Sequence, residues 1–134
     1  MNYTYIIIAT LAQFVLGALW YSPLMFGKWW MKIMGADKCT EKEIKKAEKQ
    51  MALFYALQIF LTLVFTFALS VMLIALPFSP IVTALFLLIG FIIPTQISGI
   101  IWGPTARSQQ LWQVLIVVSN QLVGILLAAF ILSF

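Results

Sequence analysis

The sequence predicts an all-α protein, a four-helix transmembrane bundle built as a single domain over residues 1–134. Of its 134 residues, 63% are hydrophobic and only 9% are charged, whereas an ordinary soluble domain carries roughly 25% charged residues. The apolar residues come in four runs of about 20, the length that crosses a hydrocarbon core about 30 Å thick. None of the runs alternates apolar and polar residues as a transmembrane strand does. All four are therefore expected to be helices.

The first predicted span covers about residues 1–20. Its first residues, Met1 to Tyr3, lack the basic side chains of a secretory signal, so we expect this span to remain in the mature protein. Trp20 and Tyr21 follow where the span is expected to leave the membrane core, a depth at which amphipathic rings collect.

A short interfacial helix is predicted next, at about residues 23–34. Ser22 is a favoured N-cap and Pro23 a favoured first helical residue, and Gly35 is a suitable stop at the other end. The Ser-Pro pair is therefore expected to end the first span and to start a new helix.

The side chains of this helix indicate contact with lipid headgroups. Lys28 and Lys32 are four residues apart on one face, and aromatic residues surround them, which is typical of a helix that lies in the headgroup plane. We therefore predict that both lysines contact membrane lipids, anionic ones included. In the alternative interpretation, Trp20, Tyr21 and Trp29 line the mouth of a pocket.

A charged helix at about residues 41–52 is predicted to run into the second span, at about residues 53–76. Thr40 and Glu43 form a capping box, in which each side chain accepts a hydrogen bond from the other residue's backbone amide. No glycine or proline interrupts residues 41–76. One helix of about 54 Å is therefore expected, at 1.5 Å per residue.

The third and fourth spans are predicted at about residues 81–102 and 111–134. A short turn at residues 77–80, with a proline at each end, separates the second span from the third. Pro94 lies inside the third span and removes a backbone donor, which leaves a carbonyl near Gly90 for a kink or for a ligand.

The charged residues predict the orientation of the bundle. Residues 28–49 contain seven lysines and all four acidic residues, and the remaining charged residue, Arg107, lies between the third and fourth spans. With four spans, these two connections fall on one side of the membrane. Lys and Arg mark the cytoplasmic side. The 21–52 loop is therefore expected in the cytoplasm and both termini outside.

Each span also has one face of polar or small residues, and these faces supply the candidate site residues. They are Gln13, Gln58, Thr62, Gln96, Gln113 and Asn120. In one interpretation the faces are helix–helix interfaces, in which amides bond across at roughly 0.6–2 kcal/mol each. In the other, the same side chains surround a cavity for a neutral or cationic solute.

The residues that are missing restrict the chemistry. There is no histidine, no charged residue lies inside a span, and Cys39 is the only cysteine. Histidine-based nucleophile activation is therefore excluded, and the ionisable group that proton-coupled transport normally needs is lacking. We predict no catalytic residue, no metal site, no cofactor and no nucleic-acid partner, and hence a protein that is not an enzyme.

The residues around the first loop resemble a known family. The run GALWYSP over residues 17–23, the Phe-Gly-Lys at 26–28, Trp30 and the Met-Gly pair at 34–35 are similar to the bacterial family named domain of unknown function 1761. The resemblance implies a small integral membrane protein of the bacterial cytoplasmic (inner) membrane, with no known activity and no catalytic residues.

Two functional hypotheses follow. The first is a non-enzymatic membrane protein that acts through lipid or protein contacts. The alternative is a carrier or pore for a small neutral or cationic solute, working as a homo-oligomer. A water-accessible cavity lined by the polar side chains would distinguish the two.

Overall fold

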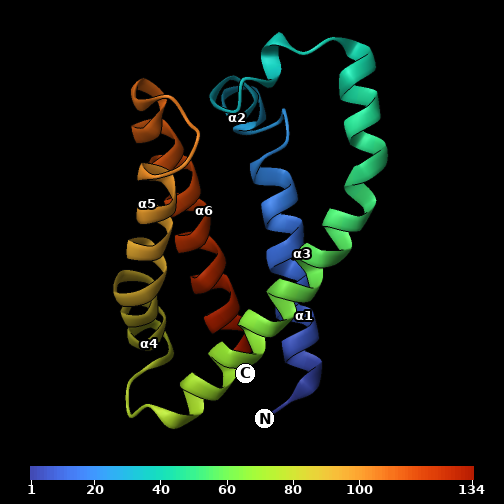
Figure 1. Ribbon diagram of the computed structural model, residues 1–134. Coiled ribbons are helices and arrows are strands. Elements are labelled where there is room, and N and C mark those ends of the chain that lie inside the picture. The colour runs from blue at the N-terminus through green and yellow to red at the C-terminus, as the bar shows by residue number, and fades with distance from the viewer.

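The computed structural model describes residues 1–134, apart from the side chain of Asp37. The elements are α1 (Tyr3–Trp20), α2 (Gly27–Ile33), the 3₁₀ turn η1 (Ala36–Lys38), α3 (Glu41–Ala75), α4 (Pro80–Leu87), the π-helix η2 (Leu88–Ile92), α5 (Ile93–Ile101) and α6 (Arg107–Leu132). Four helical units are long and apolar enough to cross a membrane: α1, α3, the continuous α4–η2–α5 and α6. The predicted fold class, an all-α four-helix transmembrane bundle, is confirmed, and the chain is a multi-pass membrane protein (Figure 1).

The charged segment and the second span form one helix of 35 residues, α3. Its capping box is present: the Glu43 amide donates to Thr40 Oγ1 at 3.3 Å, and the Thr40 amide donates to Glu43 Oε2 at 3.4 Å. The polar start of α3 extends beyond α5 and α6 at one end of the bundle (Figure 1).

The short helix after the first span begins at Gly27, so the start predicted at Pro23 is wrong. Ser22 does not cap a new helix, because its hydroxyl donates back to the Leu19 carbonyl at 2.6 Å. The Gly27 amide donates to the Ser22 carbonyl at 2.8 Å, which folds residues 22–26 into tight turns. The predicted stop is confirmed, since Gly35 adopts a φ of 74°, a conformation that favours glycine.

The proline of the third span produces a π-helix. Pro94 has no N–H to donate, and just before it the Ile93 amide bonds to the Leu88 carbonyl, five residues back. The Thr95 hydroxyl donates to the Phe91 carbonyl at 2.6 Å. The irregular turn therefore recovers part of the hydrogen bonding that the proline removes.

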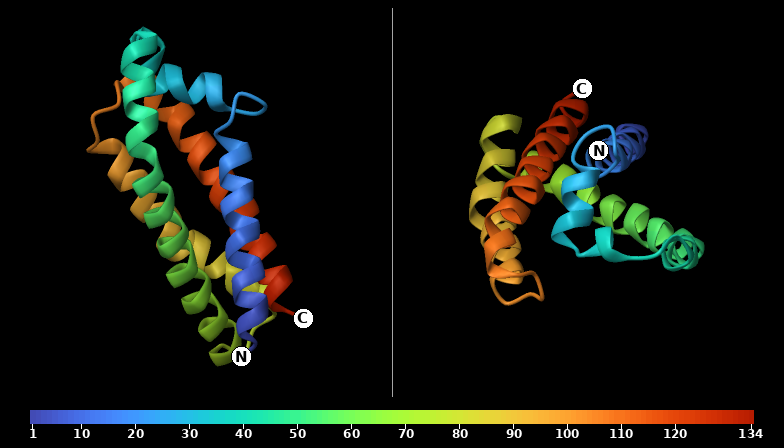
Figure 2. Two further views of the ribbon diagram at one scale, coloured as in Figure 1. Left: turned by 90° about the vertical axis from the view of Figure 1, so that its right-hand side faces the viewer. Right: turned by 90° about the horizontal axis from the view of Figure 1, so that it is seen from above.

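The four spans pack closely at only one end. The buried apolar cluster contains Ala9 of α1, Leu69 of α3, Ala84 of α4, Leu88 of η2, and Ile125, Ala128 and Ala129 of α6. It lies toward the end that carries both termini, and from there α3 diverges from α4 and α5 (Figures 1 and 2). The helices are therefore joined by the buried cluster at the terminal end, and α3 stands farther from α5 toward the other end.

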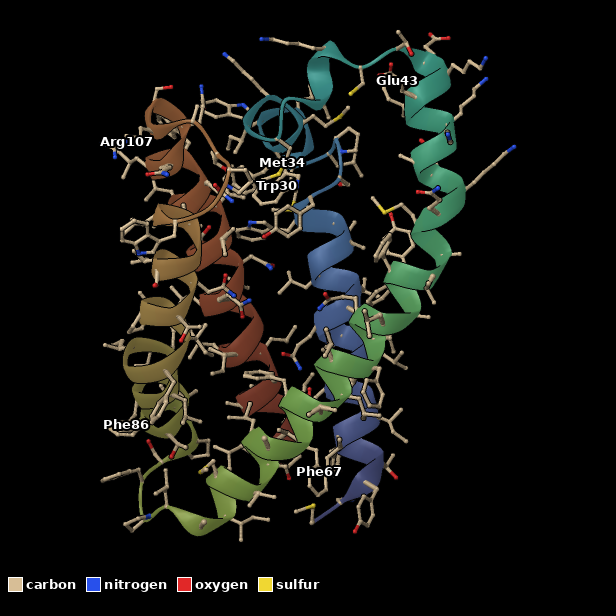
Figure 3. All side chains as sticks on the ribbon, viewed as in Figure 1. Trp30, Met34, Glu43, Phe67, Phe86 and Arg107 are labelled. Atoms are coloured by element: carbon tan, nitrogen blue, oxygen red, sulfur yellow. The ribbon has the colours of Figure 1, made fainter. Side chains whose placement is uncertain are left out.

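The two connections that carry charge lie together at that other end. The segment with α2, η1 and the start of α3, and the α5–α6 loop beside Arg107, both lie opposite the two termini (Figures 1 and 3). We call this side of the molecule the charged end.

Candidate binding cavity

A cavity of about 830 Å³ lies between the four spans, on the charged side of the buried cluster. Its polar lining consists of uncharged side chains from all four spans and from the residue after α1: Gln13, Tyr21, Gln58, Thr62, Thr95, Gln96, Asn120 and Gln121. Among the residues that the structure describes, no charged side chain lines it.

The structure brings together most of the polar residues that the sequence singles out. Gln13, Gln58, Thr62, Gln96 and Asn120 all line the cavity. Gln113 lies on α6 outside this lining, and its buried Oε1 has no hydrogen-bond partner among the described residues.

One of these residues also joins two helices. The Gln13 side-chain amide donates to Thr66 Oγ1 on α3 at 2.7 Å and to the Ala9 carbonyl of its own helix at 3.2 Å. Thr66 is fully buried. Gln13 therefore lies at the boundary between the buried cluster and the cavity, where it is both an interface residue and a lining residue.

The polar stripe of α3 is hydrogen-bonded within its own helix. The Thr62 hydroxyl donates to the Gln58 carbonyl at 2.8 Å, and the Gln58 amide donates to the Thr62 hydroxyl at 3.2 Å. The Thr66 hydroxyl donates to the Thr62 carbonyl at 2.7 Å. The hydrogen atoms of these hydroxyls are thus already engaged by backbone oxygens.

The stretch after α1 turns toward α6 and the cavity. The Trp20 indole donates to the Ile116 carbonyl of α6 at 3.1 Å. Tyr21 lines the cavity and packs on Trp30 of α2, with ring centroids 4.7 Å apart. Trp20 and Tyr21 therefore join α1 to its neighbours, and of the three residues in the pocket-mouth interpretation, Trp20, Tyr21 and Trp29, Tyr21 lines the cavity and the other two do not.

Burial raises the pKa of the Tyr21 hydroxyl, a group that is neutral at physiological pH in any case. Tyr21 follows the last residue of the first span, and burial raises the pKa of its hydroxyl, while a hydrogen bond from the Asn120 side chain acts in the opposite direction. A raised tyrosine pKa leaves the group neutral at physiological pH. The cavity is therefore uncharged on this side too.

The cavity opens sideways between α3 and α5. Phe91 beside α5 and Leu61 on α3 both line it, yet they are 62% and 51% exposed. On α1 and α6, by contrast, Gln13 and Asn120 are half-buried. We therefore call Gln13 and Asn120 the floor of the cavity and the gap between α3 and α5 its side opening, which faces the viewer in Figure 3.

Sequence reasoning passes over two of the polar lining residues, Thr95 and Gln121. Thr95 directly precedes the candidate Gln96, and Gln121 directly follows the candidate Asn120. Adjacent residues point about 100° apart around a helix. Because the prediction assigns only one polar face to each helix, it includes one residue of each pair and leaves the other out. The cavity is wide enough to take both.

The two lysines predicted to contact lipid lie away from the cavity. Lys28 and Lys32 of α2 are both exposed at the charged end. Beside them, Trp29 packs against Trp112 of α6, with ring centroids 5.3 Å apart. The α2 helix is thus tied to α6 by aromatic contact while its lysines remain available to the surroundings.

Comparison with known proteins identifies the family. No curated protein and no solved structure matches the chain. Residues 4–133, nearly the whole sequence, match the family described as protein of unknown function (DUF1761). The resemblance seen in residues 17–35 is thereby confirmed, and the chain belongs to the DUF1761 family.

Proposed function

We propose that this protein is a non-enzymatic protein of the bacterial inner membrane that acts through lipid contacts, by binding an uncharged amphiphile in its cavity. The observation that carries the proposal is the lining: an uncharged polar floor at Gln13 and Asn120 below a side opening with apolar walls. The volume of about 830 Å³ falls within the roughly 300–1,000 Å³ of small-molecule sites.

The side opening supports entry from the bilayer. An amphiphile needs a polar site for its headgroup and an apolar path for its chain. Gln13 lies about 10 Å along the helix axis from Trp20 at the end of α1. A headgroup on the floor would therefore lie within the leaflet on the charged side, with its chain passing between Leu61 and Phe91 into lipid.

The charge distribution supports a cytoplasmic position for the charged end. Seven lysines and Arg107 belong to the two connections at this end, and basic loops stay in the cytoplasm during insertion. The termini are then external, the 21–52 loop is cytoplasmic, and the side opening faces the cytoplasmic leaflet.

The polar lining also supports the alternative, a homo-oligomeric carrier or pore for a neutral or cationic solute. A carrier needs a path to the opposite side of the membrane. The buried cluster around Leu69 and Ile125 fills that path at the terminal end. Binding from the bilayer needs no such opening, which is why we favour it.

Photolabelling with a lipid analogue tests the proposal. Gly17 lines the cavity, and a Cβ added there would meet no atom within 4 Å, so Gly17→Leu adds a bulky side chain to the cavity wall at a position with free space at Cβ. Gly99 also has open space around it but lies outside the lining, so Gly99→Leu is the matched control. A diazirine-tagged monoacylglycerol in nanodiscs should label the wild type and Gly99→Leu saturably, and Gly17→Leu several-fold less.

The label should map to peptides of α3 and α5, the helices that border the side opening. Equal labelling of all three proteins, or labelling that rises linearly with probe concentration, would show that the probe samples only the outer surface. Either result would overturn the proposal.

A further inference from the structure

We propose that the start of α3 is a docking surface for an acidic helical segment of another protein. Four lysines form this surface, and they recur every three or four residues along one face of the helix: Lys42, Lys45, Lys46 and Lys49. We call them the lysine stripe. None of them lines the cavity, so the inference is independent of the binding of an amphiphile.

The lysine stripe is exposed and faces away from the bundle. All four lysines are exposed, and this part of α3 extends beyond α5 and α6 (Figure 1). Leu53, Leu57 and Phe60 continue the face of Lys49 down into the span, at helical spacing, and all three are exposed as well. The stripe therefore lies directly above the surface that α3 presents to lipid, where a partner can approach it.

The arrangement of the lysines is unfavourable without a partner. Each lysine of the stripe has two others three or four positions away, where like charges repel. Lys42 also lies in the first turn of α3, where the helix dipole disfavours a cation. No acidic residue lies three or four positions from Lys42 or Lys49. Carboxylates from outside the chain would offset both repulsions, whereas a topology signal needs basic residues but not their alignment on one face.

Lipid headgroups can reach only the lower end of the stripe. A hydrocarbon core about 30 Å thick takes about 20 residues, which places its boundary near Ala56 when counted back from Ala75, the last residue of α3. At 1.5 Å per residue, Lys49 lies about 10 Å and Lys42 about 21 Å along the helix from that boundary. The headgroup layer is only about 5–8 Å thick. A membrane surface therefore cannot neutralise the whole stripe.

The chemistry of the stripe favours an acidic helix over two other occupants. A second copy of the chain would bring lysines against lysines, and the exposed face below them, at Leu53 and Phe60, lacks the small or polar residues that join helices in membranes. Nucleic-acid sites use arginine and stacked aromatic rings, and the stripe contains neither. A helix with carboxylates at the same spacing matches it, because two helices side by side have the same rise per residue.

A designed acidic peptide tests the inference. It has about 20 residues, long enough to form a helix, with four glutamates at positions i, i+3, i+4 and i+7 and an acceptor dye. A palmitoyl chain on a flexible linker holds it on the same phosphatidylcholine nanodisc as the protein, which raises its local concentration. A donor dye on the exposed Cys39, close to Lys42 in sequence, reports its approach. A second peptide of the same composition has its glutamates spread around the helix.

A variant and a matched control locate the binding. Energy transfer should saturate in the wild type, and it should need about tenfold more peptide when the four stripe lysines are replaced with Gln, because exposed ion pairs are weak singly but act together. The control replaces the four other basic residues with Gln: Lys28, Lys32, Lys38 and Arg107. It removes the same charge and should keep the affinity within about twofold, because charges without direct contact are largely screened by salt. The peptide with spread glutamates should bind the wild type several-fold more weakly.

The other outcomes would overturn the proposal. Equal affinity of the wild type and the stripe variant, or of the two peptides, would show attraction by net charge alone. Fewer anionic lipids retained by the stripe variant than by the control in native mass spectrometry would assign the stripe to headgroups. Energy transfer between two copies labelled at Cys39, lost in the stripe variant, would assign it to a second copy. Displacement of the peptide by RNA at a lower concentration than by free glutamate peptide would assign it to nucleic acid.

Discussion

The hydrogen bond between Gln13 and Thr66 is the clearest interhelical polar contact in the bundle, and its contribution can be measured. The donor and acceptor are 2.7 Å apart, and Thr66 is fully buried. Thr66→Val keeps the shape of the side chain and leaves one Gln13 N–H without its acceptor. Interhelical side-chain bonds in membranes contribute about 0.6–2 kcal/mol. We expect Thr66→Val to lower the free energy of unfolding by about 1 kcal/mol.

A double-mutant cycle isolates this bond from other effects of the substitutions. Gln13→Leu, Thr66→Val and the double variant are unfolded by titration with a denaturing detergent, and helicity is followed by circular dichroism. The coupling energy should be about 0.6–1.7 kcal/mol. Gln58→Leu provides the comparison, because Gln58 is exposed and bonds only within α3, and it should change stability by less than about 0.5 kcal/mol. Effects of Gln13 and Thr66 that add within about 0.3 kcal/mol would refute the reasoning.

Three further predictions concern the charged end. Cys39 is exposed and should react with a membrane-impermeant maleimide only after cells are lysed; strong labelling of intact cells would reverse the proposed orientation. Replacing Lys28 and Lys32 with Gln should remove about 2 kcal/mol of attraction to anionic lipid, an effect that salt screens; native mass spectrometry should then count fewer retained anionic lipids, and equal counts would exclude headgroup binding by these lysines. Gly27→Ala should destabilise the fold by about 1–3 kcal/mol, because its Cβ would lie 2.6 Å from a backbone oxygen of the preceding turn; a thermal midpoint equal to that of the wild type would contradict this close approach.

The parts of the fold that depend on local signals are predictable from the sequence. The long α3 follows from its capping box and from the lack of a breaker, and Gly35 follows from the need for a left-handed residue at a helix end. The start of α2 is not predictable in this way. A serine hydroxyl can cap the helix that follows it or bond back to the helix before it, and the Leu19 carbonyl takes the Ser22 hydroxyl.

The position of the cavity depends on the depth at which neighbouring helices separate. The spacing of polar residues in the sequence gives the face of a helix but not this depth. Gln113 and Asn120 are seven residues apart on nearly the same face of α6. Asn120 lies at the level of the cavity, whereas Gln113 lies closer to the charged end and outside the lining. The helical repeat gives the face on which a side chain lies. Whether another helix packs against that face at a given depth depends on how the helices are tilted.

The side chains between the helices change in size along the bundle. At the terminal end, α1, α4 and α6 meet through alanines, among them Ala9, Ala84 and Ala128, each fully buried, and small residues let helix backbones approach closely. Nearer the charged end, α1 and α3 meet through the rings of Phe14 and Tyr55, whose centroids are 6.4 Å apart at an interplanar angle of 87°. Two aromatic rings occupy more space between backbones than an alanine does. The cavity therefore lies where the small side chains of the buried cluster give way to larger ones such as Phe14, which lines it.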